Sequence, residues 1–410
     1  MQSSYQILLP LAAATLAMPL SQQAAPLVSI GDNADLFFNG SSSIRWMSNV
    51  FRDDENEHED FIYTLSPGFE LNIGRGMSNT NFAIITRYDI IRYDDRDDLN
   101  GEEFHIKAVG SYRSSRLDLS GSASFDEEQS SPGESESTKD LDDLIESDNY
   151  RASLQGEYRL SPKFSIGSGV HYSDKQYTTY EDRFADRETF TVPVDVYYEL
   201  TPKVDLSAGY SYSHTSVEEI YYDNGIYIGD YDTASHFFNV GARGMLLPKL
   251  NGFFKVGYRL QDSDDSVIGL YNASKQVFPY DKTNRGDNGM LGLDLDLTWN
   301  ATPKVTVVGR ASRDFGVGGE GQNTEVTSFS LNGSYAINSN FSASANAGYT
   351  LRDYETDRED DQYRLGARLS YRPNQFWNFS TGYSYVENDS NLSGADYQNH
   401  IIDLTASLRY

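Results

Sequence analysis

The histidines of this chain are the residues that could support the widest range of chemistry, as metal ligands or as acid–base catalysts. The six are His58, His105, His171, His214, His236 and His400, and none stands at the close spacing of a metal-binding pair. The chain has no cysteine, which excludes thiolate metal sites and cysteine nucleophiles. We therefore expect no enzyme activity, no catalytic residue, no metal ligand and no cofactor. One alternative stays open, a serine–histidine or aspartate–histidine dyad that uses His58 or His214 on an exposed loop.

Acidic residues gather in short runs that could bind divalent cations. Neighbouring carboxylates are suitable ligands for Ca²⁺ or Mg²⁺, but none of the runs has the full spacing of a calcium-binding loop. Solubility and electrostatic repulsion are therefore the favoured explanation. The runs are Asp53-Asp54-Glu55, Asp94-Asp95-Arg96-Asp97-Asp98, Asp262-Ser263-Asp264-Asp265 and Arg358-Glu359-Asp360-Asp361.

A glycine-rich segment between Gly316 and Gly321 has the sequence Gly-Val-Gly-Gly-Glu-Gly and satisfies the G-x-G-x-x-G pattern. That pattern binds phosphate where a strand leads through it into a helix, and no helix is expected here. We interpret the segment as a flexible loop between two strands.

A further set of charged residues alternates with apolar residues, so that each set faces a different side of an extended chain. Two arrangements are open. Opposed basic and acidic walls would create a transverse field across a pore. Alternatively, the charges pair with neighbours on adjacent strands and stiffen the wall, which is the favoured interpretation. The candidate pore-lining residues are Arg45, Arg364, Arg368, Arg372 and Arg409 on the basic side, and Asp195, Glu199, Asp294 and Asp296 on the acidic side.

The elements that position these residues are β-strands, which recur from about residue 34 to the end of the chain. Apolar residues occupy every second position of each strand. One example is the series Phe329, Leu331, Gly333, Tyr335 and Ile337, which alternates with serine, asparagine and alanine. This period of two indicates strands with one polar and one apolar face.

Tight turns and long loops alternate between the predicted strands, and proline presets several of the turns, as in Ser161-Pro162-Lys163 and Thr302-Pro303-Lys304. The long loops are polar and acidic, as in 126–148 and 261–285. Short turns on one side and long loops on the other are typical of outer-membrane barrels. Eight turns and two terminal strands give about eighteen strands, an even number, as bacterial barrels have. The turns are expected near Arg75, Ser114, Ser161, Thr201, Pro248, Thr302, Asn338 and Pro373.

Composition supports a membrane barrel. The 410 residues have a formal net charge of −28 and are only 38% hydrophobic, yet they include 30 Tyr and 21 Phe. Disordered chains are poor in aromatic residues, and ordinary globular cores are richer in aliphatic ones. A transmembrane barrel needs apolar residues only at alternate positions and gathers aromatic residues at both membrane interfaces. The acidity argues against a nucleic-acid partner. A soluble propeller, the second choice, would not alternate its turns so strictly.

We therefore predict an all-β protein, a closed antiparallel transmembrane β-barrel of the bacterial outer membrane with short periplasmic turns and long acidic extracellular loops. Residues 1–25 are expected to form a signal peptide, because the apolar run 7–20 is too short to span a membrane as a helix. Residues 26–33 form a short periplasmic segment, and 34–410 form the barrel. Leu404, Leu408 and Tyr410 resemble the C-terminal insertion signal for the outer-membrane assembly machinery. That machinery, outer-membrane lipid and lipopolysaccharide are the expected partners.

In its Ser/Thr-Pro-Lys turns, its long acidic loops and its aromatic terminal strand, the chain resembles the β-barrel porin type 2 family of outer-membrane proteins. The resemblance spans nearly the whole mature chain and implies a passive conduit, associated with exopolysaccharide export, and no catalytic residue. We expect a channel for exopolysaccharide or small hydrophilic solutes; a non-conducting barrel that displays adhesive or cation-binding loops is the alternative. A loop that plugs the lumen would most readily come from 126–148 or 261–285.

Overall fold

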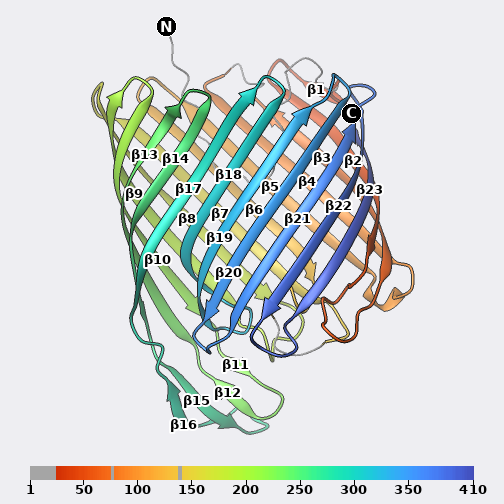
Figure 1. Cartoon of the computed structure of the whole chain (residues 1–410), viewed down its shortest axis with the longest axis vertical. Coiled ribbons are helices and arrows are strands. Elements are labelled where there is room, and N and C mark those ends of the chain that lie inside the picture. The colour runs from red at the N-terminus through yellow and green to blue at the C-terminus, as the bar shows by residue number, and fades with distance from the viewer. Residues whose placement is uncertain (1–24, 75–77, 137–140) are drawn as a thin grey trace.

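The computed structural model describes residues 25–74, 78–136 and 141–410, which form a closed antiparallel barrel of eighteen strands (Figure 1). The strands and their bounds are β2 (Ala34–Met47), β3 (Asp60–Ile73), β4 (Thr80–Tyr93), β5 (Gly101–Arg113), β6 (Leu117–Ser130), β7 (Ile145–Arg159), β8 (Phe164–Tyr177), β9 (Arg187–Thr201), β10 (Val204–Val217), β13 (Tyr231–Leu247), β14 (Leu250–Ser263), β17 (Asn288–Thr302), β18 (Val305–Val317), β19 (Asn323–Ala336), β20 (Phe341–Tyr354), β21 (Glu359–Tyr371), β22 (Trp377–Ser390) and β23 (Tyr397–Arg409).

The first and last barrel strands pair with each other and close the sheet. Their register runs from Asn39 opposite Arg409 to Met47 opposite Ile401. Beyond the end of β23, the backbone N–H of Tyr410 donates to the carbonyl of Phe38 at 2.8 Å. The predicted fold class and strand number are therefore confirmed, and both ends of the barrel sheet lie at its short-turn end (Figure 1).

The Ser/Thr-Pro-Lys turns share one hydrogen-bonding pattern. The hydroxyl of Thr201 accepts the backbone N–H groups of Lys203 and Val204 at 3.3 and 3.1 Å. The hydroxyls of Ser161 and Thr302 make the same pair of contacts in their own turns. A short polar side chain thus satisfies the backbone that proline turns away from the ladder. The turn expected near Arg75 involves residues 75–77, which lie outside the described residues.

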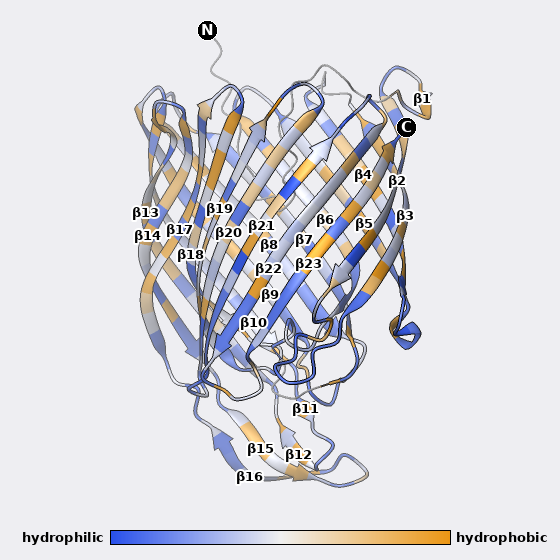
Figure 2. Ribbon diagram, turned by 45° about the vertical axis from the view of Figure 1, so that its right-hand side comes forward, coloured by the Kyte–Doolittle hydropathy of each residue, from blue (hydrophilic) through white to orange (hydrophobic). Residues whose placement is uncertain are grey.

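Apolar and polar residues alternate along each strand (Figure 2), and the apolar set is exposed on the outer surface, as at Leu331, which is 54% exposed. Eighteen strands enclose a space too wide for side chains to fill, so the apolar set faces lipid. Aromatic pairs stand at both ends of the outer face. Phe341 stacks on Tyr371 near the short turns, and Tyr349 packs on Tyr363 near the long loops.

Five smaller strands lie outside the barrel wall. β1 (Val28–Ile30) lies within the segment 26–33 that is expected to be periplasmic, and it pairs with the start of β2. β11 (Ile220–Tyr221), β12 (Ile226–Ile228), β15 (Ser266–Tyr271) and β16 (Val277–Thr283) form a separate sheet that projects beyond the long-loop end (Figure 1). The described residues include one 3-10 turn, η1 (Asp97–Leu99), and no helix of theirs is long and apolar enough to cross a membrane. The signal peptide predicted at 1–25 falls, except for its last residue, outside the described residues.

Strand orientation can be tested with a charge placed on either face of β19. Leu331→Arg puts a cation on the lipid face near mid-strand and should lower the free energy of unfolding by about 2–4 kcal/mol. Asn332→Arg, the matched control on the lumen face, should change it far less. The measurement is guanidinium unfolding of protein refolded into lipid vesicles. Equal destabilisation by both substitutions would contradict the assignment of the faces.

Candidate functional site

The lumen wall holds the charged residues that the alternation singles out, and most of them pair with neighbours. Arg368 contacts Asp403 at 2.6 Å, Arg409 contacts Glu70 at 2.9 Å, and Lys255 contacts Asp195 at 2.8 Å. Asp294 and Asp296 pair with Arg259 and Arg310 at 3.1 and 2.8 Å. Five of the nine candidate residues therefore have a countercharge, which supports the arrangement of paired charges rather than opposed walls.

The other four candidates are placed differently. No carboxylate of the described residues lies within ion-pairing distance of Arg45 or Arg364. Glu199 stands opposite another acid, Asp205, near the short turns. Arg372 follows the end of β21, and its backbone bonds to Asn340 in the turn. Among the candidate residues, Arg45 and Arg364 are therefore two cations with no carboxylate of the described residues in ion-pairing distance.

Some ion pairs join strands that lie apart in the wall. Arg243 on β13 reaches Glu157 on β7 at 2.7 Å, across three intervening strands, and also contacts Asp205 on β10 at 3.0 Å. Its guanidinium lies 3.4 Å from the ring centroid of Tyr197. A Cβ at Gly209 would lie only 2.1 Å from Asp195 Oδ1, so glycine leaves the room that the neighbouring carboxylate occupies. Sequence spacing could not show the Arg243–Glu157 pair, because β7 and β13 are not adjacent, whereas Asp205 stands directly opposite Arg243 on the neighbouring strand.

One long loop closes over the outer mouth of the barrel. Residues 131–136, which follow β6, form ion pairs through Glu134 to Arg52 at 3.1 Å and through Glu136 to Arg352 at 2.9 Å. Arg358 donates to the carbonyl of Glu136 at 3.1 Å. Arg52 belongs to the β2–β3 loop, Arg352 to the end of β20 and Arg358 to the β20–β21 loop, across the barrel from β6, so the segment crosses the mouth. Of the two expected plugging loops, 126–148 supplies the covering segment, whereas 261–285 contributes β15 and β16 of the projecting sheet.

The glycine-rich segment meets this covering loop. Gly319 lies so close to the carbonyl of Ser135 that an added Cβ would be 2.1 Å from its oxygen. Arg187 donates to the carbonyls of Val317 and Gly318 at 3.0 and 2.9 Å. Residues 318–321 are buried. They form a loop between strands, as expected, but one packed into the mouth, because contacts with distant loops hold it there.

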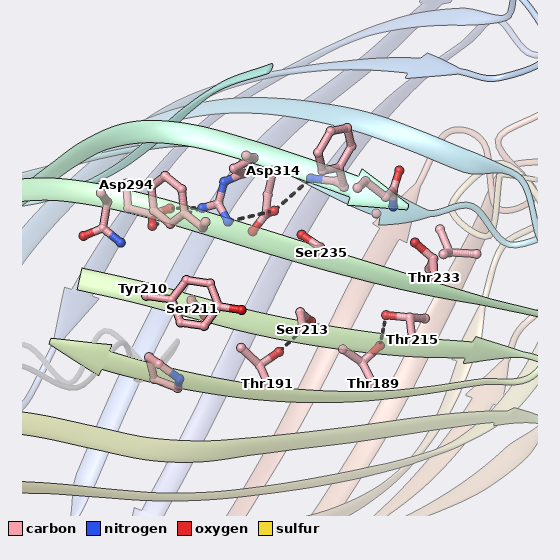
Figure 3. Close-up of a pocket in the computed structure, with 18 of the residues that line it drawn as sticks. Thr189, Thr191, Tyr210, Ser211, Ser213, Thr215, Thr233, Ser235, Asp294 and Asp314 are labelled. Carbon is pink, nitrogen blue, oxygen red and sulfur yellow. Dashed lines mark hydrogen bonds and ion pairs between the residues drawn. The ribbon is translucent and has the colours of Figure 1, made fainter. Parts of the chain in front are cut away.

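Below the mouth, the wall of β9, β10 and β13 forms a pocket of about 380 Å³ rich in hydroxyl groups (Figure 3). Thr189 and Thr191 hydrogen-bond to Thr215 and Ser213 at 3.0 and 2.8 Å. Charged and aromatic groups complete the lining, and Arg259 stacks on Phe237 at 3.7 Å. Arg259 and Phe237 are themselves buried, at 6% and 3% exposure, so the groups of this set that can face a polar ligand are the hydroxyls. The serine and threonine residues labelled in Figure 3 are Thr189, Thr191, Ser211, Ser213, Thr215, Thr233 and Ser235.

The histidines are spread over both faces. His171 contacts Gln155 on the lumen side, and His236 and His400 contact Tyr210 and Tyr383 on the lipid side. The dyad left open at His58 or His214 stays a prediction. His214 Nε2 lies 3.9 Å from Asp232 Oδ1. Within 25–74, 78–136 and 141–410, no serine hydroxyl bonds to either ring.

The C-terminal residues proposed as an insertion signal belong to the closing strand. Leu404 and Tyr410 are exposed on the outer face, and Leu408 pairs with Gly40 and Trp377. Their recognition by the assembly machinery stays a prediction.

The closed wall, the apolar face toward lipid and the polar lumen together define a porin-like barrel of the bacterial outer membrane. The model of the family described as Putative beta-barrel porin 2 matches residues 39–274 and 281–410, and the chain belongs to that family. No curated protein matches the sequence.

Solved outer-membrane proteins are similar only in outline. The ferric-catecholate import receptor Fiu of E. coli K12, in its open form, is 10% identical, with 95% of this chain and 82% of that one covered and a TM-score of 0.48. The outer-membrane protein OpdK of Pseudomonas aeruginosa is 8% identical, with 92% and 99% covered and a TM-score of 0.41. OccAB3 of Acinetobacter baumannii is 11% identical, with 93% and 100% covered and a TM-score of 0.43.

The Arg243 cluster should stabilise the short-turn half of the wall. Glu157→Gln removes the charge that two guanidinium nitrogens contact, and should lower the free energy of unfolding by roughly 1–2 kcal/mol in this partly wet site. Glu102→Gln, which weakens a more exposed pair with Arg92 at 2.9 Å, should have almost no effect. Chemical unfolding measures both. An equal loss from the two substitutions would refute a special role for the cluster.

A loop carboxyl makes the mouth sensitive to pH. Asp186, between β8 and β9, accepts the backbone N–H of Tyr177 at 2.7 Å. Burial, with the nearby carboxylates of Glu218, Asp174 and Glu181, raises the pKa of Asp186 from 3.8 to about 6. The folded loop therefore favours the protonated carboxyl. This stabilisation is complete below pH 3.8 and is lost as the pH rises through about 6.

Hydrogen exchange of residues 178–186 should accordingly show greater protection at about pH 5 than at about pH 7.5, after correction for the intrinsic rate. The neutral variant Asp186→Asn should show the same protection at both values. A pH effect that survives in the variant would assign it to another group.

Proposed function

We propose that this protein is an outer-membrane conduit for hydroxyl-rich, hydrophilic solutes, including a secreted polysaccharide. The pocket of hydroxyl side chains beneath the mouth is the observation that supports it most directly. Hydroxyl groups both donate and accept hydrogen bonds, so Thr189, Thr191 and Ser213 can replace the water that a sugar loses. Transport needs no catalytic residue, and we propose none.

The covering loop makes this conduit gated. Polar contacts hold residues 131–136 at a water-exposed mouth, and ion pairs in such places contribute about 0–1 kcal/mol each. Glu134, for example, is 50% exposed in its pair with Arg52. The Glu134–Arg52 pair therefore stabilises the closed arrangement only weakly, whereas Glu136 and Arg352, each 20% exposed, form the less exposed pair. A solute that enters from the lumen therefore needs little free energy to break the Glu134–Arg52 pair when it displaces the loop.

A second candidate function is a display barrel that conducts nothing. The projecting sheet of β11, β12, β15 and β16 favours it, since this sheet extends beyond the wall and exposes Leu270, Phe278 and Tyr280. In this case the loops would bind a partner at the cell surface or divalent cations. Lipopolysaccharide around the wall and the assembly machinery are partners that we propose for either function.

Single-channel recording in a planar bilayer separates the two functions. The native protein should conduct in brief openings. The double variant Glu134→Gln/Glu136→Gln, which loses two pairs worth about 1 kcal/mol together, should shift the closed–open balance roughly fivefold toward open. Asp118→Asn, a lumen carboxylate distant from the mouth, serves as the control and should leave the balance unchanged. Complete silence of the native protein and of the double variant would reject the conduit.

Export is tested separately by deletion of the gene. Loss of polysaccharide from the cell surface, restored by the native chain, is the expected result. Unaltered surface polysaccharide would reject export and leave conduction of smaller solutes to the bilayer experiment.

A further inference from the structure

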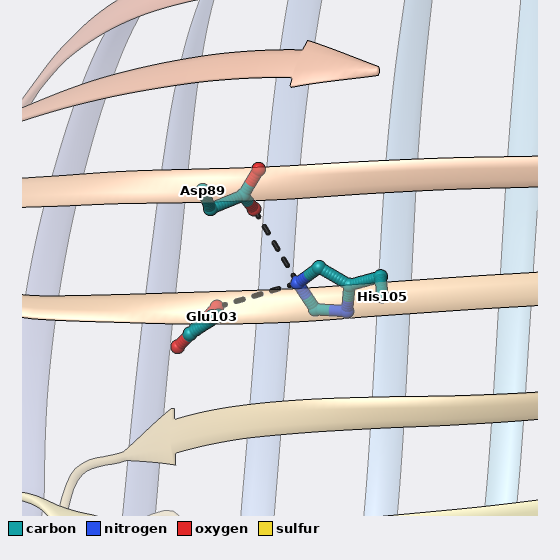
Figure 4. A group of neighbouring side chains, drawn as sticks. All are labelled: Asp89, Glu103 and His105. Carbon is teal, nitrogen blue, oxygen red and sulfur yellow. Dashed lines mark ion pairs between the residues drawn. The ribbon is translucent and has the colours of Figure 1, made fainter. Parts of the chain in front are cut away.

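Three side chains from two neighbouring strands meet on the lumen wall close to the long-loop end. Asp89 on β4 stands directly opposite Glu103 on β5, and His105 follows Glu103 by two residues on the same face. Figure 4 shows both carboxylates directed at the same ring nitrogen. Asp89 Oδ2 and Glu103 Oε2 each lie 3.5 Å from His105 Nε2. Strand register alone brings the three together.

One oxygen of each carboxylate contacts a neighbouring group of the wall, and the other oxygen faces His105. Asp89 Oδ1 lies 2.9 Å from Arg87 Nε. Glu103 Oε1 accepts a hydrogen bond from the backbone N–H of Gln129 at 2.8 Å. Because these contacts use Oδ1 and Oε1, the oxygens that face His105 remain available to a ligand.

The ring of His105 is held in the same way. Its Nδ1 lies 3.0 Å from Asp126 Oδ1 on β6, and a carboxylate accepts, so Nδ1 holds the proton. Nε2 of the neutral ring therefore presents a lone pair toward two carboxylates. That nitrogen is fully buried and has no hydrogen-bond partner among the described residues. A carboxylate behind a histidine that faces a cluster of donors is the arrangement found around protein-bound metals.

We propose that Asp89, Glu103 and His105 form a binding site for a divalent transition metal of the zinc class. The three donor atoms all lie within 4.8 Å of one another. Zinc bonds of 2.0–2.2 Å in tetrahedral geometry place ligand atoms about 3.3–3.6 Å apart, close to the two nitrogen–oxygen distances here. The mixed nitrogen and oxygen donors favour zinc over Ca²⁺ and Mg²⁺, which prefer oxygen alone. A fourth position remains for water or a solute from the lumen.

Charge supports a cation at this place. Asp89, Glu103 and Asp126 bring three negative charges to the cluster, whereas Arg87 and Arg151 bring two positive ones. Without a metal, the cluster would keep an excess negative charge unless His105 takes a second proton. A doubly protonated His105 is the competing arrangement, and it would form an ordinary ion-pair network with no affinity for metal.

Zinc titration of the purified full-length barrel, stripped with chelator and free of any histidine tag, distinguishes the two arrangements. The native protein should bind one zinc more than His105→Gln, and equal concentrations of Ca²⁺ should not displace that zinc. The matched control is His171→Gln, because His171 also faces the lumen from a strand but contacts Gln155 rather than carboxylates. The control should bind as the native protein does. Heat-modifiable gel mobility verifies that each variant is a folded barrel.

Two further measurements make the assignment specific. Co²⁺ should give visible absorption bands in the native protein that His105→Gln abolishes. Asp126→Asn should weaken zinc binding by about 10–100-fold without changing the stoichiometry, since Asp126 only orients the ring. Equal zinc binding by the native protein and a folded His105→Gln barrel, or no binding by either, would overturn the proposal and favour the protonated histidine.

Discussion

The hydrocarbon core of a membrane offers no hydrogen-bond partner to a peptide group, so every spanning strand must pair on both sides. In this protein that requirement is met by closing β23 onto β2, with Tyr410 bonded to Phe38 at the seam. This closure determines which side chains face lipid and which face the lumen. Eighteen strands enclose a space too wide for side chains to fill, which sends apolar residues outward and leaves charged residues in contact with water.

The same closure explains how the wall accommodates so many charges. A lumen carboxylate or guanidinium that cannot enter lipid finds a partner on the neighbouring strand, as Arg310 does in Asp296, or several strands away, as Arg243 does in Glu157. Small residues such as Gly209 leave space for such side chains. Many lumen charges are thus neutralised by a partner on the wall. The hydroxyl groups of the pocket add hydrogen-bonding capacity, which in the proposed conduit would suit uncharged, hydrogen-bonding solutes.

The features on which the proposed functions rest gather at the outer end, where the strands lead into loops that fold inward. The covering segment 131–136, the buried turn around Gly319 and the cluster at His105 all lie there, at or beneath the mouth. In the proposed conduit, a solute leaving the lumen would pass the hydroxyl pocket and then meet the covering loop. A metal at His105 would tie β4 to β5 beside that route.

Strand number, the lipid face and the turn positions could be predicted from the chain alone, because alternation and turn chemistry are local properties, as in 329–337 and at Thr201. The alternation predicted that lumen charges would pair, but it could not predict which residues pair, since Arg243 and Glu157 are 86 residues apart in the chain. The inward fold of Gly316–Gly321 and the meeting of Asp89 with His105 could not be foreseen. Both depend on register between strands and on contacts between distant loops, which arise when the sheet closes.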